Sequence, residues 1–271
     1  MSAGWKVMGV CNATPDSFSD GGLLPSAEAA IAHSLDLVEQ GAAIIDVGGE
    51  STRPGAEPVS EQEELRRVIP VIEGIATAAP QVQISVDTMK VAVASAALAA
   101  GASYINDVSG FTAEPQMAQL VADAGCDCCL MHMLGSPQTM QDDPQYDNVV
   151  AEVCEFLSER AELALAAGIA RERIAVDPGI GFGKTIEHNL DLLANLDAVA
   201  AIGFPVVIGL SRKRFLGELT GAQQPDQRVA ATVAANVLAF ERGASVFRVH
   251  DVRETVDGLK LASATLARDG R

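Results

Sequence analysis

Short runs of apolar and β-branched residues recur along the whole chain, and each is followed by an amphipathic stretch long enough to form a helix. Strands separated by helices pair in parallel, because the helical crossover returns the chain to the same end of the sheet. The alternation therefore predicts an α/β fold. Eight runs are expected to be strands: Val7–Val10, Ile44–Val47, Val82–Val86, Tyr104–Ile105, Cys128–Met131, Ile174–Val176, Val206–Ile208 and Val246–Val249.

Eight such units in 271 residues predict a closed TIM (β/α)8 barrel, with a doubly wound open sheet as the alternative. The phrase Gly-Ala at positions 41, 101 and 243 marks helix ends that lead into strands. No linker rich in Pro, Ser or charge interrupts the pattern, so residues 1–271 are expected to form a single domain. The expected helices are Ala27–Gln40, Gln62–Ala79, Val91–Ala100, Pro115–Ala124, Val149–Ala167, Asn189–Ala201, Gln227–Arg242 and Glu254–Leu266.

Composition limits the partners of this fold. Hydrophobic residues make up 48% of the chain, which is enough for a large core, and the net charge of −17 argues against nucleic acid or an anionic membrane as a partner. The sequence contains neither an 18-residue apolar run nor a basic segment leading into one at Met1–Trp5, so we expect a cytoplasmic protein. Cys126, Cys128 and Cys129 indicate a buried strand, with a zinc site as the weaker alternative.

Polar residues gather where the expected strands end. In a parallel barrel the active site is built at the carboxyl ends of the strands. Any one of these residues could be a solvated strand end or a helix cap, but their occurrence after all eight strands indicates a site. They include Asn12, Asp46, Asp87, Asn106, Asp107, His132, Asp177, Ser211, Arg248 and His250.

Charges at these strand ends suggest the chemistry of a ligand. Six of the 19 basic residues follow strands, which would attract a small anion to this face. Asp87, Asn106 and Asp177 could accept the paired N–H donors of a 2-amino-4-oxopyrimidine ring, to whose carbonyl Lys213 could donate. A pterin satisfies these groups, and guanine would do so nearly as well. The six basic residues are Arg53, Lys184, Arg212, Lys213, Arg214 and Arg248.

Eight segments contain these strand ends and the loops that follow them: Met8–Gly22, Ile45–Ala56, Ser85–Thr88, Ile105–Asp107, Leu130–His132, Val176–Lys184, Ser211–Lys213 and Arg248–Asp251. They resemble the signatures of the dihydropteroate synthase family and occur in the family's order. The resemblance extends from about Val7 to Leu266. It implies a pterin-binding TIM barrel that condenses 6-hydroxymethyl-7,8-dihydropterin pyrophosphate with p-aminobenzoate and releases pyrophosphate.

The same resemblance implies residue roles. The pterin would be held by Asp87, Asn106, Asp177, Lys213 and Arg248. The p-aminobenzoate and the loops over it would involve Phe18, Thr52, Pro54 and Phe182. Asn12, Arg248 and His250 would bind the pyrophosphate, with Asn12 also meeting Mg²⁺, and the catalytic set would be Asn12, Arg53, Lys213, Arg248 and His250. A dissociative displacement and a homodimer are also implied.

Two other functions fit part of the pattern. A pterin-dependent methyltransferase would share the Asp and Asn contacts but needs no pyrophosphate site. Four residues together therefore favour the synthase: Arg53, Lys213, Arg248 and His250. A non-catalytic pterin-binding paralogue should lose the loop residues Thr14–Phe18 or Ser51–Pro54, which are present here. Arg214 stands where many family members have Ser, and its role stays open.

Overall fold

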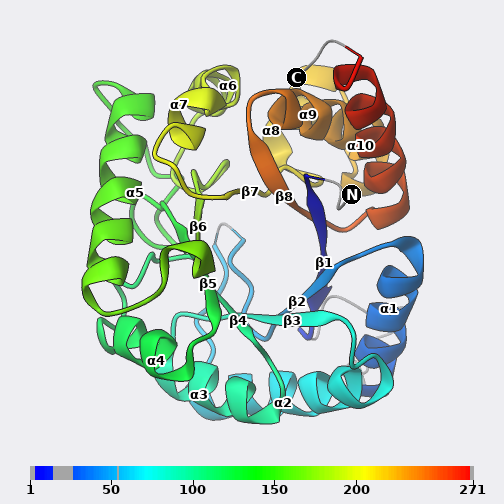
Figure 1. The fold of residues 1–271 in the computed structure, drawn as a ribbon. Coiled ribbons are helices and arrows are strands. Elements are labelled where there is room, and N and C mark those ends of the chain that lie inside the picture. Colours follow the sequence, from blue (N-terminus) through cyan, green and yellow to red (C-terminus); the bar gives the residue numbers. More distant parts are fainter. Residues whose placement is uncertain (1–3, 15–26, 54, 269–271) are drawn as a thin grey trace.

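The computed structural model describes residues 4–14, 27–53 and 55–268. Eight parallel strands close into a barrel in chain order, and helices form a ring outside it (Figure 1). The predicted barrel is therefore confirmed, and the open-sheet alternative is wrong, because β8 pairs with β1. The strands are β1 (Lys6–Asn12), β2 (Ile44–Gly48), β3 (Gln83–Asp87), β4 (Tyr104–Asp107), β5 (Asp127–Met131), β6 (Ile174–Asp177), β7 (Val206–Ile208) and β8 (Ala244–Val249).

The helices follow the expected order with two differences. The stretch predicted as one helix, Asn189–Ala201, is divided into two helices at Asn195. The first of them begins earlier than expected, because Thr185 and His188 form a capping box. A short helix directly after Lys213 was not predicted, since its length gives little periodicity. The helices are α1 (Ala27–Gln40), α2 (Glu61–Ala78), α3 (Val91–Ala100), α4 (Gln116–Ala124), α5 (Val149–Ala166), α6 (Ile186–Ala194), α7 (Leu196–Ala200), α8 (Arg214–Thr220), α9 (Val229–Glu241) and α10 (Val252–Leu266).

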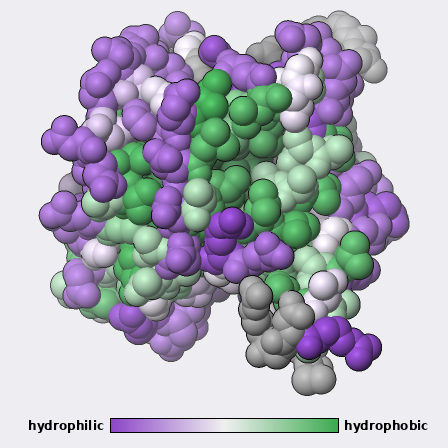
Figure 2. Space-filling view, turned by 90° about the horizontal axis from the view of Figure 1, so that it is seen from above, coloured by the Kyte–Doolittle hydropathy of each residue, from purple (hydrophilic) through white to green (hydrophobic). Residues whose placement is uncertain are grey.

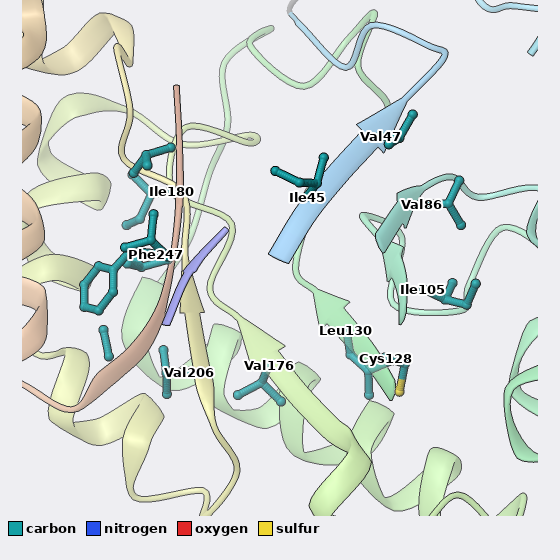
Figure 3. Packing of buried hydrophobic residues seen from close by; sticks show 14 of the residues in the cluster. Ile45, Val47, Val86, Ile105, Cys128, Leu130, Val176, Ile180, Val206 and Phe247 are labelled. Atoms are coloured by element: carbon teal, nitrogen blue, oxygen red, sulfur yellow. The ribbon is translucent and has the colours of Figure 1, made fainter. Parts of the chain in front are cut away.

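Side chains on each strand alternate between the helices and the barrel interior. The outward residues, such as Ile45, Val86 and Phe247, belong to the main core that the strands share with the helices (Figure 3). The inward residues at the amino-terminal half form a separate apolar cluster inside the barrel, which closes it below the strand ends. This barrel floor consists of Met8, Ile44, Tyr104, Cys129, Ala175, Val207 and Val246.

The neighbouring thiols on β5 follow the same alternation. Cys128 belongs to the outer core and Cys129 to the barrel floor, and both are fully buried. The prediction that this segment is a buried strand is confirmed. Among residues 4–14, 27–53 and 55–268, no group of three His, Cys, Asp or Glu side chains could hold a metal ion. No helix in the same described part is long and apolar enough to cross a membrane.

Helix α3 ends at Gly101, the first residue of a Gly-Ala pair, which has a left-handed backbone conformation. Gly101 has φ 118° and ψ 4°, and its N–H donates to the carbonyl of Leu98 at 3.2 Å. A Cβ on Gly101 would lie only 2.9 Å from the Cβ of Ala76. Gly125 ends α4 at φ 60° and ψ 32°, with open space where a Cβ would be. The two helix ends therefore make different demands on the residue that follows.

We expect Gly101→Ala to lower the free energy of unfolding by more than Gly125→Ala. Alanine at Gly125 has only the left-handed conformation to adopt, which costs about 1–2 kcal/mol. Alanine at Gly101 would have to adopt a φ of 118° and would also clash with Ala76. Urea unfolding followed by circular dichroism measures both values. Equal losses would show that the contact with Ala76 relaxes freely.

Candidate active site

A buried ion pair joins three strands inside the barrel, above the barrel floor. Arg248 on β8 donates from Nε to Asp46 Oδ2 at 2.6 Å and from Nη2 to Asp87 Oδ2 at 2.8 Å. Asp46 lies on β2 and is 0% exposed, and Asp87 ends β3. Two carboxylates therefore flank one guanidinium at the place where the strands end. The predicted site residues Asp87 and Arg248 are in direct contact.

Asp46 connects this pair to its neighbours. Ser85 donates its hydroxyl to Asp46 Oδ1 at 2.6 Å, and Asn106 donates its amide to Oδ2 at 3.1 Å. The sequence places Asp46 among the polar residues at strand ends but does not predict a contact with a ligand for it. Its partner Ser85 lies directly beside it on β3, two residues before Asp87. The period-two spacing of Ser85 and Asp87 was therefore a usable signal for an inward-facing polar row.

Burial and neighbouring charge set the protonation of this group. Burial raises the pKa of Asp87 to about 7; Arg248 acts in the opposite direction, and Asp46 adds to the rise. Burial alone would lower the pKa of Arg248, but Asp46 and Asp87 hold it above its ordinary value. The guanidinium thus stays charged, while Asp87 is poised near neutrality and can respond to a ligand that donates hydrogen bonds.

Asp177 and Lys213 form the other side of the mouth. The backbone N–H of Gly179 donates to Asp177 Oδ1 at 2.7 Å. Burial raises the pKa of Asp177, while this hydrogen bond and the charges of Lys213 and Arg248 lower it. Burial also lowers the pKa of Lys213 to about 8, against the attraction of Asp177. The two side chains are thus close enough to influence each other and could serve one ligand.

Four side chains fix the loop that follows Asp177. Consecutive carbonyls of residues 180–183 each accept a hydrogen bond from a side chain outside that tetrapeptide. The ring of Phe182 also lies 4.2 Å from Lys213 Nζ, a cation–π contact. The donors are Lys213 to Ile180, Gln141 to Gly181 at 2.8 Å, Lys184 to Phe182 at 3.0 Å and Tyr146 to Gly183 at 2.9 Å. The loop is held rigidly against the barrel mouth.

Lys184 lies behind the site rather than in it. It is 2% exposed and its Nζ lies 2.9 Å from His132 Nδ1. Burial lowers the pKa of Lys184 to about 7, although the charge of Asp177 acts to raise it. Burial, together with the charge of Lys184, lowers the pKa of His132 to about 3. Lys184 is therefore buried beside His132, and its charge still acts on Asp177 at the mouth.

Two further basic residues are paired with carboxylates. Arg212 donates to both oxygens of Asp251, at 3.0 and 2.6 Å, and Arg214 pairs with Glu218 on the exposed side of α8. The positive face expected from the sequence is therefore largely offset by carboxylates, because Arg248 is likewise paired with Asp46 and Asp87.

His250 follows β8 at the edge of the mouth. Its backbone N–H donates to Ser211 Oγ at 3.1 Å, and its Nδ1 lies 3.0 Å from the same oxygen. Burial, then the charges of Arg248 and Arg212, lower the pKa of His250 to about 3. The imidazole is therefore neutral at pH 7 and can donate or accept a hydrogen bond through Nε2.

The loop residues expected at the site are only partly described. Arg53 is exposed and contributes to the electrostatic field at His250, and Thr52 is half-buried. Phe18 and Pro54 lie outside the described residues. The structure therefore brings together the residues that were predicted to hold a pterin, while the roles of Phe18 and Pro54 remain predictions.

Asn12 ends β1 beside Gly48 and is the predicted ligand for a cation. Its Oδ1 and Asp87 Oδ2 each lie 3.8 Å from the place of a Cβ on Gly48, and Asp87 Oδ2 also accepts from Arg248. An amide oxygen suits Mg²⁺, which commonly keeps waters and substrate phosphates as its other ligands. Asn12 could therefore be one ligand of an ion that takes its other ligands from elsewhere.

Comparison with known proteins gives this arrangement a class. A family model described as "Pterin binding enzyme" matches residues 8–250. The chain is 47% identical over 261 residues to the dihydropteroate synthase of Escherichia coli (strain K12), covering 96% of this chain and 92% of that protein. The barrel with its acidic and basic mouth is thus that of a pterin-binding enzyme.

Solved structures make the assignment narrower. A Xanthomonas albilineans dihydropteroate synthase with 4-aminobenzoic acid superposes with a TM-score of 0.91 at 53% identity, over 97% of this chain and 93% of that chain. A second one from the same organism, in complex with 7,8-dihydropteroate, has a TM-score of 0.87 at 49% identity, over 97% and 94%. The chain belongs to the dihydropteroate synthase family, whose members are transferases of folate synthesis.

We expect Asp46→Asn to lower the free energy of unfolding by about 3–5 kcal/mol, because it leaves part of a buried charge on Arg248 uncompensated. Asp127→Asn is the matched control: Asp127 pairs with Arg173 at 3.2 Å on the surface at the opposite end of the barrel. Its loss should be about 1 kcal/mol or less. Denaturant titration measures both. Similar effects of the two substitutions would contradict the central role of Asp46.

Proposed function

We propose that this chain condenses 6-hydroxymethyl-7,8-dihydropterin pyrophosphate with p-aminobenzoate to give 7,8-dihydropteroate and pyrophosphate. The observation that carries the proposal is the convergence of Asp87, Asn106 and Asp177 with Lys213 and Arg248 above an apolar floor. The related structures that contain 4-aminobenzoic acid and 7,8-dihydropteroate support the same substrates for this chain.

The pterin would bind between the strands that carry the carboxylates. Asp177 and Asp87 would accept its ring N–H donors, while Asn106 both donates and accepts. Lys213 would donate to the ring carbonyl, and the planar guanidinium of Arg248 would lie along the ring face. Such a ligand would replace water at carboxylates that are expensive to bury alone.

The pyrophosphate would lie at the edge near β1 and β8. His250, neutral by its lowered pKa, and Asn12 would bind it together with Arg248, while Arg53 would reach over the p-aminobenzoate from its loop. Mg²⁺ at Asn12, when bound, would neutralise charge on the departing phosphates. In the reaction the bond between the pterin methylene carbon and the bridging oxygen breaks, and the amine nitrogen bonds to that carbon and loses a proton.

The protein's contribution to this displacement is electrostatic and positional. Donors already in place around the leaving group lower the barrier without rearranging at the moment of reaction. We propose that Thr52, Phe182 and the undescribed Phe18 and Pro54 enclose the p-aminobenzoate and exclude water from the reacting carbon. The fixed carbonyls of the loop at 180–183 would keep Phe182 in place.

Two substitutions separate substrate binding from the chemical step. Asp177→Asn places an amide donor opposite a ring N–H, and pterin affinity should fall by about 2–5 kcal/mol. Arg53→Ala should leave pterin binding nearly intact but reduce product formation strongly, because Arg53 lies on the loop and not in the ring site. Calorimetry with the dihydropterin pyrophosphate measures binding, and an assay for dihydropteroate measures product formation.

Wild-type pterin affinity in Asp177→Asn would disprove the ring assignment. Absence of dihydropteroate from the wild-type enzyme supplied with both substrates and Mg²⁺ would disprove the proposed reaction. Unchanged product formation by Arg53→Ala would remove that residue from the catalytic set.

We also propose that two copies of this chain associate through α6, α9 and α10. Hydrophobic residues gather in the middle of the face that these helices form (Figure 2). Leu190, Leu238 and Leu261, one on each helix, are 39%, 43% and 72% exposed. An apolar patch of this kind on an acidic protein is typical of a contact between subunits.

Sedimentation velocity tests the homodimer. The wild type should sediment as a dimer, and Leu238→Lys should shift it to a monomer because the lysine would be buried in the contact. Glu162→Lys on α5, outside this face, is the control and should stay dimeric. A monomeric wild type, or an intact dimer in the Leu238→Lys variant, would exclude this interface.

We propose a cytoplasmic location and a single functional domain spanning residues 1–271. The five cysteines are free thiols, four of them buried, which is typical of proteins in reducing compartments. Cell fractionation with an antibody against the protein checks the location; enrichment in a membrane or exported fraction would contradict it.

A further inference from the structure

A half-buried lysine joins the loop after β2 to α2. Lys90 forms ion pairs with Glu50, which follows β2, and with Glu64 on α2. The side chains of Lys90 and Glu50 are 23% and 16% exposed, and that of Glu64 only 1%. Burial by itself lowers the pKa of Lys90, but Glu50 and Glu64 together hold it above its ordinary value. The ammonium is therefore charged at neutral pH.

A second contact holds the start of the same loop. Arg67 on α2 donates from Nη1 to the carbonyl of Gly49 at 2.8 Å. A Cβ on Gly49 would lie 2.7 Å from Val68 Cγ1 and 3.0 Å from Glu64 Cγ, so the backbone here is pressed against α2. The base of the loop is thus fixed at two consecutive residues, Gly49 and Glu50.

Beyond Glu50 the loop has fewer attachments. Its next residues, Ser51 and Thr52, are half-buried, and Arg53 is exposed. On the far side, the N–H of Gly55 donates to the carbonyl of Pro137 at 3.1 Å. Arg53 therefore projects from a segment that is held at Gly49 and Glu50 on one side and at Gly55 on the other.

Lys90 also stands close to the ring site. It follows Asp87 by three residues, and its N–H donates to Thr88 Oγ1 at 3.2 Å. Lys90 alone is enough to neutralise Glu64. Glu50 adds a second negative charge to this neutral pair, so the stability of α2 does not explain why Glu50 also contacts Lys90. The contact between Glu50 and Lys90 instead attaches the loop to α2.

We propose that Lys90 is a positioning residue for the condensation: by holding Glu50 against α2 it sets the path of residues 51–53 and so the place of Thr52 and Arg53 over the p-aminobenzoate. This inference rests on the role proposed above for the loop. Neither Lys90 nor Glu50 touches a substrate. Their effect is on the amine substrate and not on the pterin, because Asp87 and Asp177 bind the ring independently of Glu50.

Glu50→Gln is the most direct test, since it removes the loop's charge and leaves the pair between Lys90 and Glu64 intact. We expect the KM for p-aminobenzoate to rise about three- to ten-fold, the effect of losing one partly buried ion pair. The Kd for the dihydropterin pyrophosphate should stay within about two-fold and the Tm should hardly change. Amide exchange in residues 51–53 should become faster without any substrate.

Variants of Lys90 provide the matched set. Lys90→Met should raise the same KM and also lower the Tm, because Glu64 then loses its cation, whereas Lys90→Arg should largely restore the KM. The double variant Glu50→Gln/Lys90→Met should raise the KM no further than either substitution alone. Arg173→Met, which breaks an exposed ion pair at the opposite end of the barrel, should leave all these values at wild type.

A wild-type KM together with wild-type amide exchange in Glu50→Gln would overturn the inference. Additive KM effects in the double variant would also overturn it, since the two residues would then act separately. If the wild type forms no dihydropteroate, the proposed reaction fails, but exchange at residues 51–53 still shows whether Glu50 and Lys90 hold the loop.

Discussion

The ion pair between Arg248 and Asp46 is the interaction on which the rest of the site depends. Arg248 lies beside Met8 on β1, and Asp46 lies beside Val10 on the other side of that strand, so the guanidinium reaches across β1. This contact exists only when β8 closes on β1. A buried guanidinium is expensive without close acceptors, and closure supplies two carboxylates and orders Ser85 and Asn106 around them.

This charged layer explains why the barrel mouth can bind a polar ring. Below it the barrel floor is apolar and excludes water, which strengthens each electrostatic interaction above. Asp46, Asp87 and Asp177 outnumber the cations Arg248 and Lys213 that face them. Asp46 is satisfied internally, whereas Asp87 and Asp177 keep raised pKa values. The excess acceptor capacity is thus located where a ligand with several N–H donors would bind.

The loops around the mouth differ in how they are held. The loop at 180–183 has a side-chain donor on every carbonyl and forms a fixed wall. The loop after β2 is fixed at Gly49 and Glu50 and exposed at Arg53. A rigid wall suits the part of a site that orients a ring, and a loop with fewer side-chain contacts suits a part that closes after binding.

The sequence by itself determined the barrel, its strands and the polar residues at its mouth. Strand and helix periods are local properties, and polar residues at the carboxyl ends of parallel strands meet wherever the barrel closes. The motifs around Asp87, Asp177 and Arg248 carried the family as well. These features depend on spacing along the chain, so they could be predicted without coordinates.

Only the tertiary structure decided which polar residues pair with one another. Asp46 became the centre of the site and Lys184 a buried support because of neighbours on other strands and loops. The division at Asn195 and the short α8 are likewise not encoded in the hydrophobic pattern, and neither α7 nor α8 begins with a side-chain cap. Ion pairs such as Lys90 with Glu50 join residues 40 apart, and their energy depends on burial, which exists only after the chain has folded.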